Sequence, residues 1–347
     1  MAERNYTVDK ERVMLCAQEL QHNSEGSVTC LACQHRCRIA DGAVGICGVR
    51  ENREGQLVSL MYGHPAAQHL DPIEKKPLYH VLPGTRVLSA GTLGCNMSCR
   101  WCQNCSIAAP PRGAIARMQQ QPTVSPQELV EQACRSQAAG IAFTYNEPTV
   151  WIEYARHTAE LARQRGLAGL WVSNGYLTPQ AWDYLSPHLT AANIDLKAFS
   201  DRTCRRYSGS SLQPVLDSIV HLHRQTEVWV EVTMLIIPGV NDDPHELQAA
   251  FEFLVGLSPQ IPLHLSGFHP AHRMQEHPAT SRIQLLQLAS QARQAGIQFV
   301  YLGNTGDTMD ISCPSCGHTA IQRNEYPTDG SCRACGSPLP GVWEVRQ

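Results

Sequence analysis

The chain has 347 residues, with 28 Lys and Arg against 31 Asp and Glu, so its formal net charge is −3 at pH 7. This length predicts two or three domains, and a hydrophobic fraction of 43% excludes general disorder. A charge so close to neutral argues against a protein that coats nucleic acid or an anionic membrane. No apolar run reaches the roughly 18 residues of a membrane span, and the N-terminus MAERNYTVDKER lacks the apolar core of a signal peptide. We therefore expect a cytoplasmic protein that binds neither nucleic acid nor membrane.

Short β-rich runs alternate with helical patterns through the middle of the chain. The expected strands are 87–91, 141–145, 168–173, 191–196, 227–236, 262–268 and 297–303. Between them, Ser125–Glu128 forms a capping box, Thr178 and Asp243 each precede a Pro as helix N-caps, and a helix is expected over about 149–166. Residues 106–124 are interpreted as an irregular connection. Regular alternation predicts a parallel β/α architecture, and six or seven units favour a complete or partial barrel. The predicted fold class is α/β, as a partial (β/α)6-type barrel.

The 15 cysteines form three groups of four, with three left over. Disulfides are not expected in a reducing compartment, where close spacings indicate metal binding or catalysis. The groups are Cys30, Cys33, Cys37 and Cys47; Cys95, Cys99, Cys102 and Cys105; and Cys313, Cys316, Cys332 and Cys335. They divide the chain into an N-terminal Cys-rich extension (1–84), the barrel (85–306) and a C-terminal metal module (307–347). Cys16, Cys134 and Cys204 are interpreted as small buried apolar residues.

The barrel group offers two alternative sets of ligands. Cys95, Cys99 and Cys102 have C-x3-C-x2-C spacing on a loop after a predicted strand. Three thiolates on one short loop suit three corners of a cubane [4Fe–4S] cluster, whose fourth iron stays open. Cys99, Cys102 and Cys105 also match the C-x2-C-x2-C of bacterial ferredoxins, but that motif continues with a Cys where this chain has Ala109. We favour the first set, with Cys105 as a bystander; a structural zinc ion would need a fourth ligand.

The two flanking groups predict further metal sites. The C-terminal spacing, C-x2-C-x15-C-x2-C, predicts a zinc ribbon, although a rubredoxin-like iron site has the same spacing. Either metal would staple a module too small to fold securely by itself. The N-terminal spacing, C-x2-C-x3-C-x9-C, is less specific. It predicts zinc or an auxiliary iron–sulfur cluster, with His35 as a candidate to replace one thiol.

Several strings occur in an order that is more specific than the cysteine spacing alone. They are CLAC (30–33), GICG (45–48), DPIEKKPLYH (71–80), GTLGCNMSCRWCQN (91–104), TYNEPT (144–149), WVSNGY (171–176), IDLKAF (194–199), IIPGVND (236–242) and CPSCG (313–317). The barrel region resembles radical SAM enzymes of the pyruvate formate-lyase-activating type. Nearly the whole chain resembles the radical SAM enzyme of the AmmeMemoRadiSam system.

The resemblance implies that the open iron is chelated by S-adenosylmethionine. The cofactor-binding residues it implies are Trp101, Asn104, Glu147, Ser173, Asn174, Asp195 and Lys197. Trp101 would lie near the adenine, and Glu147 matches the position that receives the methionine amino group. Ser173 and Asn174 match a segment that contacts the ribose and the carboxylate. Lys197, in an Asp-Leu-Lys element, could meet that carboxylate, with a salt bridge to the Asp of the element as the structural alternative.

The implied activity is reductive cleavage of S-adenosylmethionine to methionine and a 5′-deoxyadenosyl radical, which takes a hydrogen atom from a substrate. A low-potential donor, flavodoxin or ferredoxin, is implied as a partner. The AmmeMemoRadiSam resemblance adds AMMECR-type and Memo-type proteins. Two alternatives stay open: activation of a glycyl-radical enzyme, and a non-catalytic iron–sulfur and zinc protein that carries electrons or acts as a scaffold. No residue is assigned as a catalytic acid or base.

Overall fold

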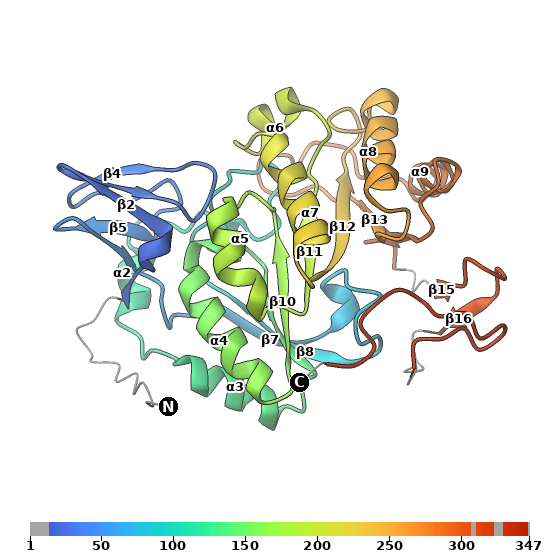
Figure 1. Cartoon of the computed structure of the whole chain (residues 1–347). Coiled ribbons are helices and arrows are strands. Elements are labelled where there is room, and N and C mark those ends of the chain that lie inside the picture. Colours follow the sequence, from blue (N-terminus) through green and yellow to red (C-terminus); the bar gives the residue numbers. More distant parts are fainter. Residues whose placement is uncertain (1–13, 307–309, 323–328, 346–347) are drawn as a thin grey trace.

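An eight-stranded sheet forms the centre of the protein (Figure 1). The structure is a computed structural model that describes residues 14–306, 310–322 and 329–345. The strands of the sheet are β7 (Ala67–Pro72), β8 (Arg86–Gly91), β9 (Gly140–Phe143), β10 (Ala168–Ser173), β11 (Ala191–Asp195), β12 (Trp229–Ile236), β13 (Leu263–Gly267) and β14 (Val300–Gly303). Strands β8 to β14 run parallel in chain order, and β7 pairs antiparallel with β8. The predicted α/β fold with a partial barrel is confirmed, because the sheet ends at β7 and β14 instead of closing.

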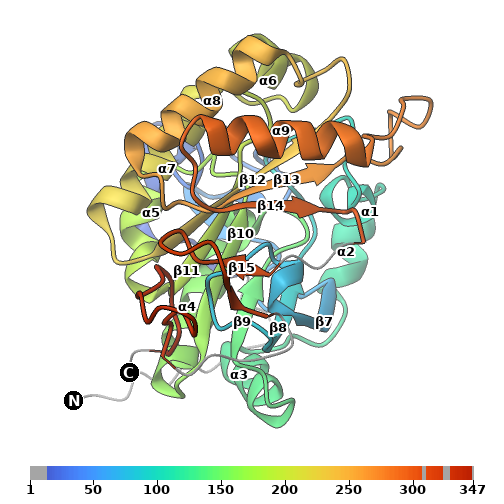
Figure 2. The same ribbon diagram turned by 90° about the vertical axis from the view of Figure 1, so that its right-hand side faces the viewer.

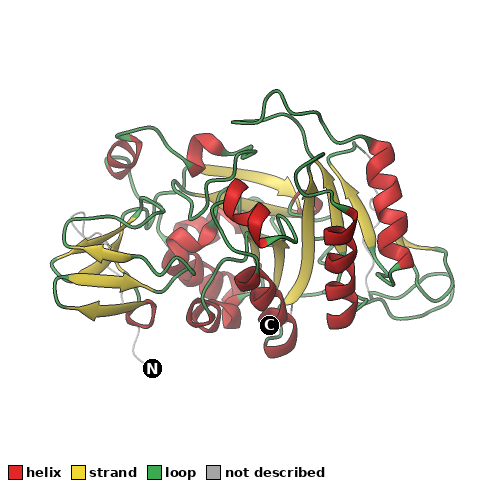
Figure 3. Ribbon diagram, turned by 90° about the horizontal axis from the view of Figure 1, so that it is seen from above, coloured by secondary structure: helices red, strands yellow, loops and turns green. Residues whose placement is uncertain are grey.

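Helices cover the outer face of the sheet (Figures 2 and 3). They are α3 (Pro126–Arg135), α4 (Ile152–Gln164), α5 (Pro179–Leu185), α6 (Asp201–Tyr207), α7 (Gln213–Gln225), α8 (Pro244–Leu257) and α9 (Arg282–Gln294), with short 3-10 turns at η3 (Pro148–Trp151) and η4 (Ser186–His188). The caps predicted at Ser125, Thr178 and Asp243 are all made, since each side chain accepts a hydrogen bond from the first turn of its helix. None of the described helices combines the length and the apolar character that crossing a membrane requires.

Four details of the barrel differ from the sequence-based expectations. Strand β7 was not predicted, because its residues are mostly half-exposed at a sheet edge and show no apolar alternation. Strand β14 begins at Val300, later than expected. Residues 106–124 are not wholly irregular, since they contain most of α1 (Cys105–Ala108) and all of α2 (Ala114–Gln119). Cys134 is exposed on α3, so its assignment as a buried residue was wrong; Cys16 and Cys204 are buried as predicted.

The N-terminal extension forms two small antiparallel sheets beside the barrel, drawn in blue in Figure 1. One contains β2 (Gln21–Ser24), β3 (Ser27–Cys30) and β4 (Arg38–Ala40); the other contains β1 (Met14–Leu15), β5 (Arg50–Arg53) and β6 (Gln56–Ser59). The 3-10 turn η1 (Gln18–Leu20) joins them, and η2 (Ile73–Lys75) follows β7. The cysteines of the extension lie in and between these strands, so their positions depend on the pairing of short segments.

The C-terminal module lies at the amino ends of the barrel strands. Its sheet contains β15 (Ile311–Ser312) and β16 (Thr319–Ile321). After it the chain returns to the barrel, where the Val342 N–H donates to the His80 carbonyl at 2.7 Å. The His80 imidazole contacts the Pro340 carbonyl at 2.7 Å and the Tyr301 hydroxyl at 2.6 Å. The tail thus covers the end of the barrel that is opposite the carboxyl ends of the strands.

Candidate active site

The carboxyl ends of β8 to β11 bring the predicted cofactor-binding residues to one rim of the barrel. Parallel strands end on the same side of their sheet, so the loops that follow them gather there. The cysteine loop (residues 92–104) follows β8, and Glu147 follows β9. Asn174 follows β10, and Lys197 follows β11. The rim therefore combines thiols, a carboxylate, an amide and an ammonium group.

Backbone hydrogen bonds fix the centre of the cysteine loop. The Ser98 N–H donates to the Ser208 carbonyl at 2.9 Å. The Arg100 N–H donates to the Tyr207 carbonyl at 2.9 Å, and the Arg100 carbonyl accepts from the Arg273 N–H at 2.9 Å. The loop is therefore held between the end of α6 and the segment after β13 by contacts that do not involve a metal.

The three thiols of the loop are held in their neutral form by their surroundings. Burial raises the pKa of Cys95 well above its ordinary value, and the nearby Glu147 carboxylate adds to this rise. Burial raises the pKa of Cys99 to about 11, against the opposing charge of Lys197. Burial also raises the pKa of Cys102. Because iron binds thiolates, loading this loop must displace a proton from each thiol.

The thiols of the cysteine loop are not gathered around a point that a single metal ion could occupy. In the part of the chain that the structure describes, only the C-terminal cysteines bring three or more Cys, His, Asp or Glu ligand atoms within 4.8 Å of one another. Cys95, Cys99 and Cys102 form no such group. In a cubane each thiolate binds a different iron, so the thiols stand farther apart than around one ion. The donor set thus fits a [4Fe–4S] cluster with one iron left open.

Glu147 is the most buried acidic group of the rim, with 1% of its surface exposed. Its Oε1 accepts from the Thr149 N–H and hydroxyl at 3.0 and 2.5 Å and from the Ser173 hydroxyl at 2.9 Å. Its Oε2 accepts only from the Asn174 N–H, at 2.8 Å. Burial raises its pKa, and these hydrogen bonds oppose the rise. Because each carboxylate oxygen has two lone pairs, Oε2 keeps one acceptor site for a further donor.

Asp195 and Lys197 form an ion pair at the end of β11. Lys197 Nζ lies 3.0 Å from Asp195 Oδ2. Burial lowers the pKa of Lys197, but Asp195 and then Cys99 outweigh it, so the net shift is upward and the ammonium stays charged. The Asn241 amide donates to the Lys197 carbonyl at 2.8 Å and fixes the backbone there. The salt bridge is therefore present, and it leaves a cation beside the cysteine loop.

Trp101 and Asn104 occupy the far part of the cysteine loop. Trp101 is buried in an apolar cluster with Ile237 and Phe268, which follow β12 and β13. The Asn104 amide donates to the Tyr145 carbonyl at 2.5 Å, so it ties the loop after β8 to the loop after β9. Cys105, the expected bystander thiol, is the first residue of α1.

Asn96 was missed by the sequence analysis, although it directly follows Cys95. It is buried, and its Oδ1 accepts from the Asn174 amide at 2.8 Å. Its carbonyl contacts His35 Nε2 at 2.7 Å, and its own Nδ2 has no hydrogen-bond partner. Asn96 thus links the cysteine loop to the segment after β10 and to the N-terminal extension. Its position inside the cysteine motif was the only available signal.

The C-terminal cysteines have the geometry of a site for one metal ion. Sγ of Cys313 lies 3.7 Å from Sγ of Cys335, and Sγ of Cys316 lies 3.7 Å from Sγ of Cys332. A tetrahedral ion with metal–sulfur bonds of about 2.3 Å requires sulfur–sulfur distances of about 3.8 Å. The four thiols could therefore hold one metal ion without rearrangement.

The chain is similar to a known family and to a known relative. Residues 90–254 match the family model of the Radical SAM superfamily. The chain is similar to Uncharacterized protein MJ0808 from Methanocaldococcus jannaschii, with 36% identity over 330 residues that cover 91% of this chain and 96% of the relative. The matched superfamily region contains the cysteine loop and the residues of the rim after β9, β10 and β11.

Three solved structures also resemble the chain. A domain of the pyruvate-formate lyase-activating enzyme from Bacteroides vulgatus has a TM-score of 0.41 at 18% identity, over 48% of this chain and all of that domain (100%). TYW1 with a lysine-pyruvate adduct bound has a TM-score of 0.46 at 16% identity, over 67% of this chain and 84% of that one. A radical SAM methyltransferase from Sphaerobacter thermophilus has a TM-score of 0.46 at 15% identity, over 63% and 66%.

Proposed function

We propose that the chain, whose residues 90–254 match the Radical SAM superfamily, cleaves S-adenosylmethionine reductively and takes a hydrogen atom from a substrate within the AmmeMemoRadiSam system. A [4Fe–4S] cluster and S-adenosylmethionine are the cofactors that this superfamily implies. Cys95, Cys99 and Cys102 would hold the cluster. The observation that carries the proposal is a set of three thiols on one anchored loop, beside the buried Glu147 carboxylate, which keeps one acceptor site free.

The residues of the rim would bind and orient the cofactor. When bound, the cluster supplies the electron that splits S-adenosylmethionine into methionine and a 5′-deoxyadenosyl radical. The free acceptor of Glu147 would receive an N–H of the amino group, in a charge-assisted hydrogen bond. Lys197 would face the carboxylate group of the cofactor. Ser173 and Asn174 hold the Glu147 carboxylate in one orientation, so its acceptor needs little reorganisation on binding.

The partners follow from the chemistry and from the resemblance. Enzymes of this superfamily need a low-potential reductant such as flavodoxin or ferredoxin, and such an oxygen-sensitive centre suits the cytoplasm. We assign AMMECR-type and Memo-type proteins as further partners on the ordered sequence strings alone. For the C-terminal group we assign zinc, which suits four thiols at distances of 3.7 Å and a structural role away from the rim.

Release of 5′-deoxyadenosine tests the function directly. Anaerobically reconstituted protein with dithionite and S-adenosylmethionine should release the nucleoside, and Cys95→Ala should abolish the release. Cys105→Ala is the matched control, since it removes a thiol three residues beyond Cys102 and should leave the release unchanged. Activity that depends on Cys105 and not on Cys95 would move the cluster to the ferredoxin spacing.

Electron paramagnetic resonance separates an enzyme from an electron carrier. The spectrum of the reduced cluster should change when S-adenosylmethionine is added, because an open iron gains a ligand. A cluster fully ligated by the protein would keep its spectrum and would support a carrier or scaffold instead.

A further inference from the structure

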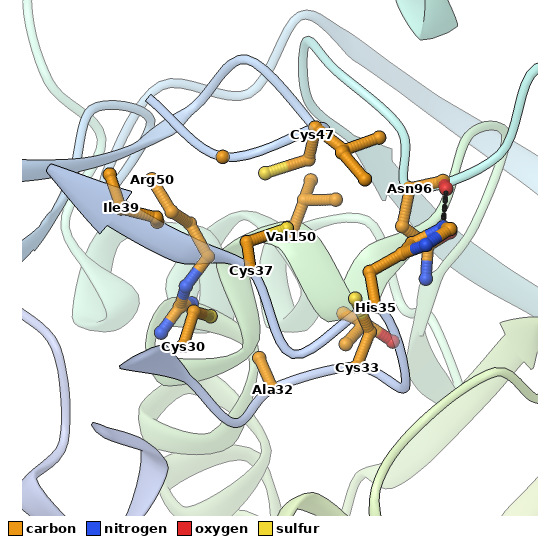
Figure 4. A pocket seen from close by; sticks show the side chains of 13 residues that line it. Cys30, Ala32, Cys33, His35, Cys37, Ile39, Cys47, Arg50, Asn96 and Val150 are labelled. Atoms are coloured by element: carbon orange, nitrogen blue, oxygen red, sulfur yellow. Dashed lines mark hydrogen bonds between the residues drawn. The ribbon is translucent and has the colours of Figure 1, made fainter. Parts of the chain in front are cut away.

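The four cysteines of the N-terminal extension line one pocket (Figure 4). They are Cys30, Cys33, Cys37 and Cys47. The pocket lies between the extension and the barrel, because Asn96 and Val150 of the barrel also line it. Four thiols around one space are a donor set for a metal ion or for an iron–sulfur cluster.

The spacing of these thiols excludes the arrangement seen at the C-terminal site. Among the described residues, no group that includes the N-terminal cysteines brings three ligand atoms within 4.8 Å of one another. A single zinc ion needs its sulfur ligands about 3.8 Å apart. The C-terminal thiols meet that requirement, whereas Cys95, Cys99 and Cys102, which suit a cubane, do not. By this comparison the N-terminal thiols are not gathered for a single ion, and a cluster, whose thiolates bind different irons, is compatible with their wider spacing.

Arg50 provides a second, independent indication of an occupant that accepts a hydrogen bond. Its side chain is 2% exposed, and both terminal nitrogens donate to the Glu153 carboxylate, at 2.9 and 2.7 Å. Arg50 lines the pocket, and its Nε has no hydrogen-bond partner. In Figure 4 the guanidinium lies next to Cys30. A buried N–H without an acceptor is unfavourable, and a thiolate or an inorganic sulfide would supply the acceptor that a neutral thiol provides poorly.

The pocket adjoins the cysteine loop of the candidate active site. His35, between two of the four cysteines, contacts the Asn96 carbonyl at 2.7 Å. The Cys47 carbonyl packs against Gly94, where an added Cβ would lie only 2.6 Å from that oxygen. The Gln34 N–H donates to the Tyr176 carbonyl, in the segment after β10, at 3.0 Å. The extension therefore contacts both the cysteine loop and the segment after β10, the two segments that flank Oε2 of Glu147.

We propose that Cys30, Cys33, Cys37 and Cys47 hold a second iron–sulfur cluster of the cubane class, which fixes the N-terminal extension against the cysteine loop of the barrel. The geometry of the pocket carries this proposal, so it does not require that S-adenosylmethionine be cleaved. His35 is not needed as a ligand, since the four thiols already supply one ligand for each iron of a cubane. Zinc at this site is the alternative that the experiment must separate.

Counts of acid-labile sulfide, iron and zinc per chain in the anaerobically reconstituted full-length protein test the proposal. Two cubanes would give about eight sulfides, four from each. One zinc ion or one rubredoxin-like iron at the C-terminal site adds metal without adding sulfide, so sulfide is the deciding count. About four sulfides in the wild-type protein, with two zinc ions, would overturn the proposal.

Variants assign the sulfide to the two sites. The triple variant Cys95→Ala, Cys99→Ala and Cys102→Ala should keep about four sulfides, even though it releases no 5′-deoxyadenosine. Cys30→Ala with Cys33→Ala should lose about half of the wild-type sulfide. Cys16→Ala is the matched control, since Cys16 is buried in the same apolar cluster as Cys30 but does not line the pocket. A triple variant that folds and holds no sulfide would contradict the second cluster, whatever the outcome of the activity assay.

Discussion

Replacing Glu153 by alanine should destabilise the protein far more than replacing an acidic residue at the surface of the same helix. Glu153 lies in the first turn of α4, and Arg50 lies on β5, so their ion pair joins the barrel to the N-terminal extension. Both side chains are 2% exposed, and the shortest contact is 2.7 Å. The variant would remove the carboxylate that accepts from both terminal nitrogens of the buried guanidinium. Breaking a buried pair in this way costs about 3–5 kcal/mol.

Urea unfolding of anaerobically prepared protein measures this difference. The control is Glu160→Ala, also on α4, whose side chain is 45% exposed and whose oxygen lies 3.9 Å from Arg156. An exposed pair of this kind contributes under about 1 kcal/mol. The double variant Arg50→Met with Glu153→Leu should recover most of the loss, because apolar residues of similar volume can replace a buried pair. If Glu153→Ala lowered the free energy of unfolding no more than Glu160→Ala does, the ion pair between Arg50 and Glu153 would not stabilise the contact between the extension and the barrel.

Three further predictions concern the rim, the loop contact and acid stability. Glu147→Gln should weaken binding of S-adenosylmethionine about tenfold or more, since a charge-assisted hydrogen bond is worth about 1.5–3 kcal/mol; equilibrium dialysis at unchanged iron content checks this, and an unchanged Kd would contradict it. Gly94→Ala should lower the urea midpoint more than Gly26→Ala. Both glycines have a positive φ, but only at Gly94 would an added Cβ meet the Cys47 carbonyl. Equal decreases of the two midpoints would refute the contact between Gly94 and Cys47. Burial opposes ionisation of Asp71, but hydrogen bonds from two lysines and a tyrosine outweigh it and hold its pKa well below its usual range. Its contribution to stability is therefore complete above the ordinary value of about 3.9 and is lost as pH falls below it, so the stability gap between wild type and Asp71→Asn should narrow in acid, and a constant gap would refute the shift.

The barrel was predictable where local patterns decide the structure. The strand over 168–173 and the cap at Ser125 were placed correctly, because short apolar runs and capping residues act within a few positions of the chain. Strand β7 was not predictable in this way. It forms because β8 offers a free edge, and nothing in its own residues indicates that partner.

The candidate site likewise contains some residues that local motifs identify and others that only contacts with distant parts of the chain identify. The spacing of Cys95, Cys99 and Cys102 and the position of Glu147 could be identified from motifs within single loops. The role of Asn96 could not, since it arises from contacts with His35 and Asn174, which come from distant parts of the chain. Contacts of this kind depend on how the extension docks on the barrel, which no local pattern encodes.

The tail that covers the amino ends of the strands is synthesised after the strands that it covers. His80 is translated 260 residues before Pro340, whose carbonyl its imidazole contacts. At translation rates of about 5–20 residues per second, the segment around His80 waits on the order of ten seconds or more for this partner. This end of the barrel therefore stays uncovered until the tail has been synthesised.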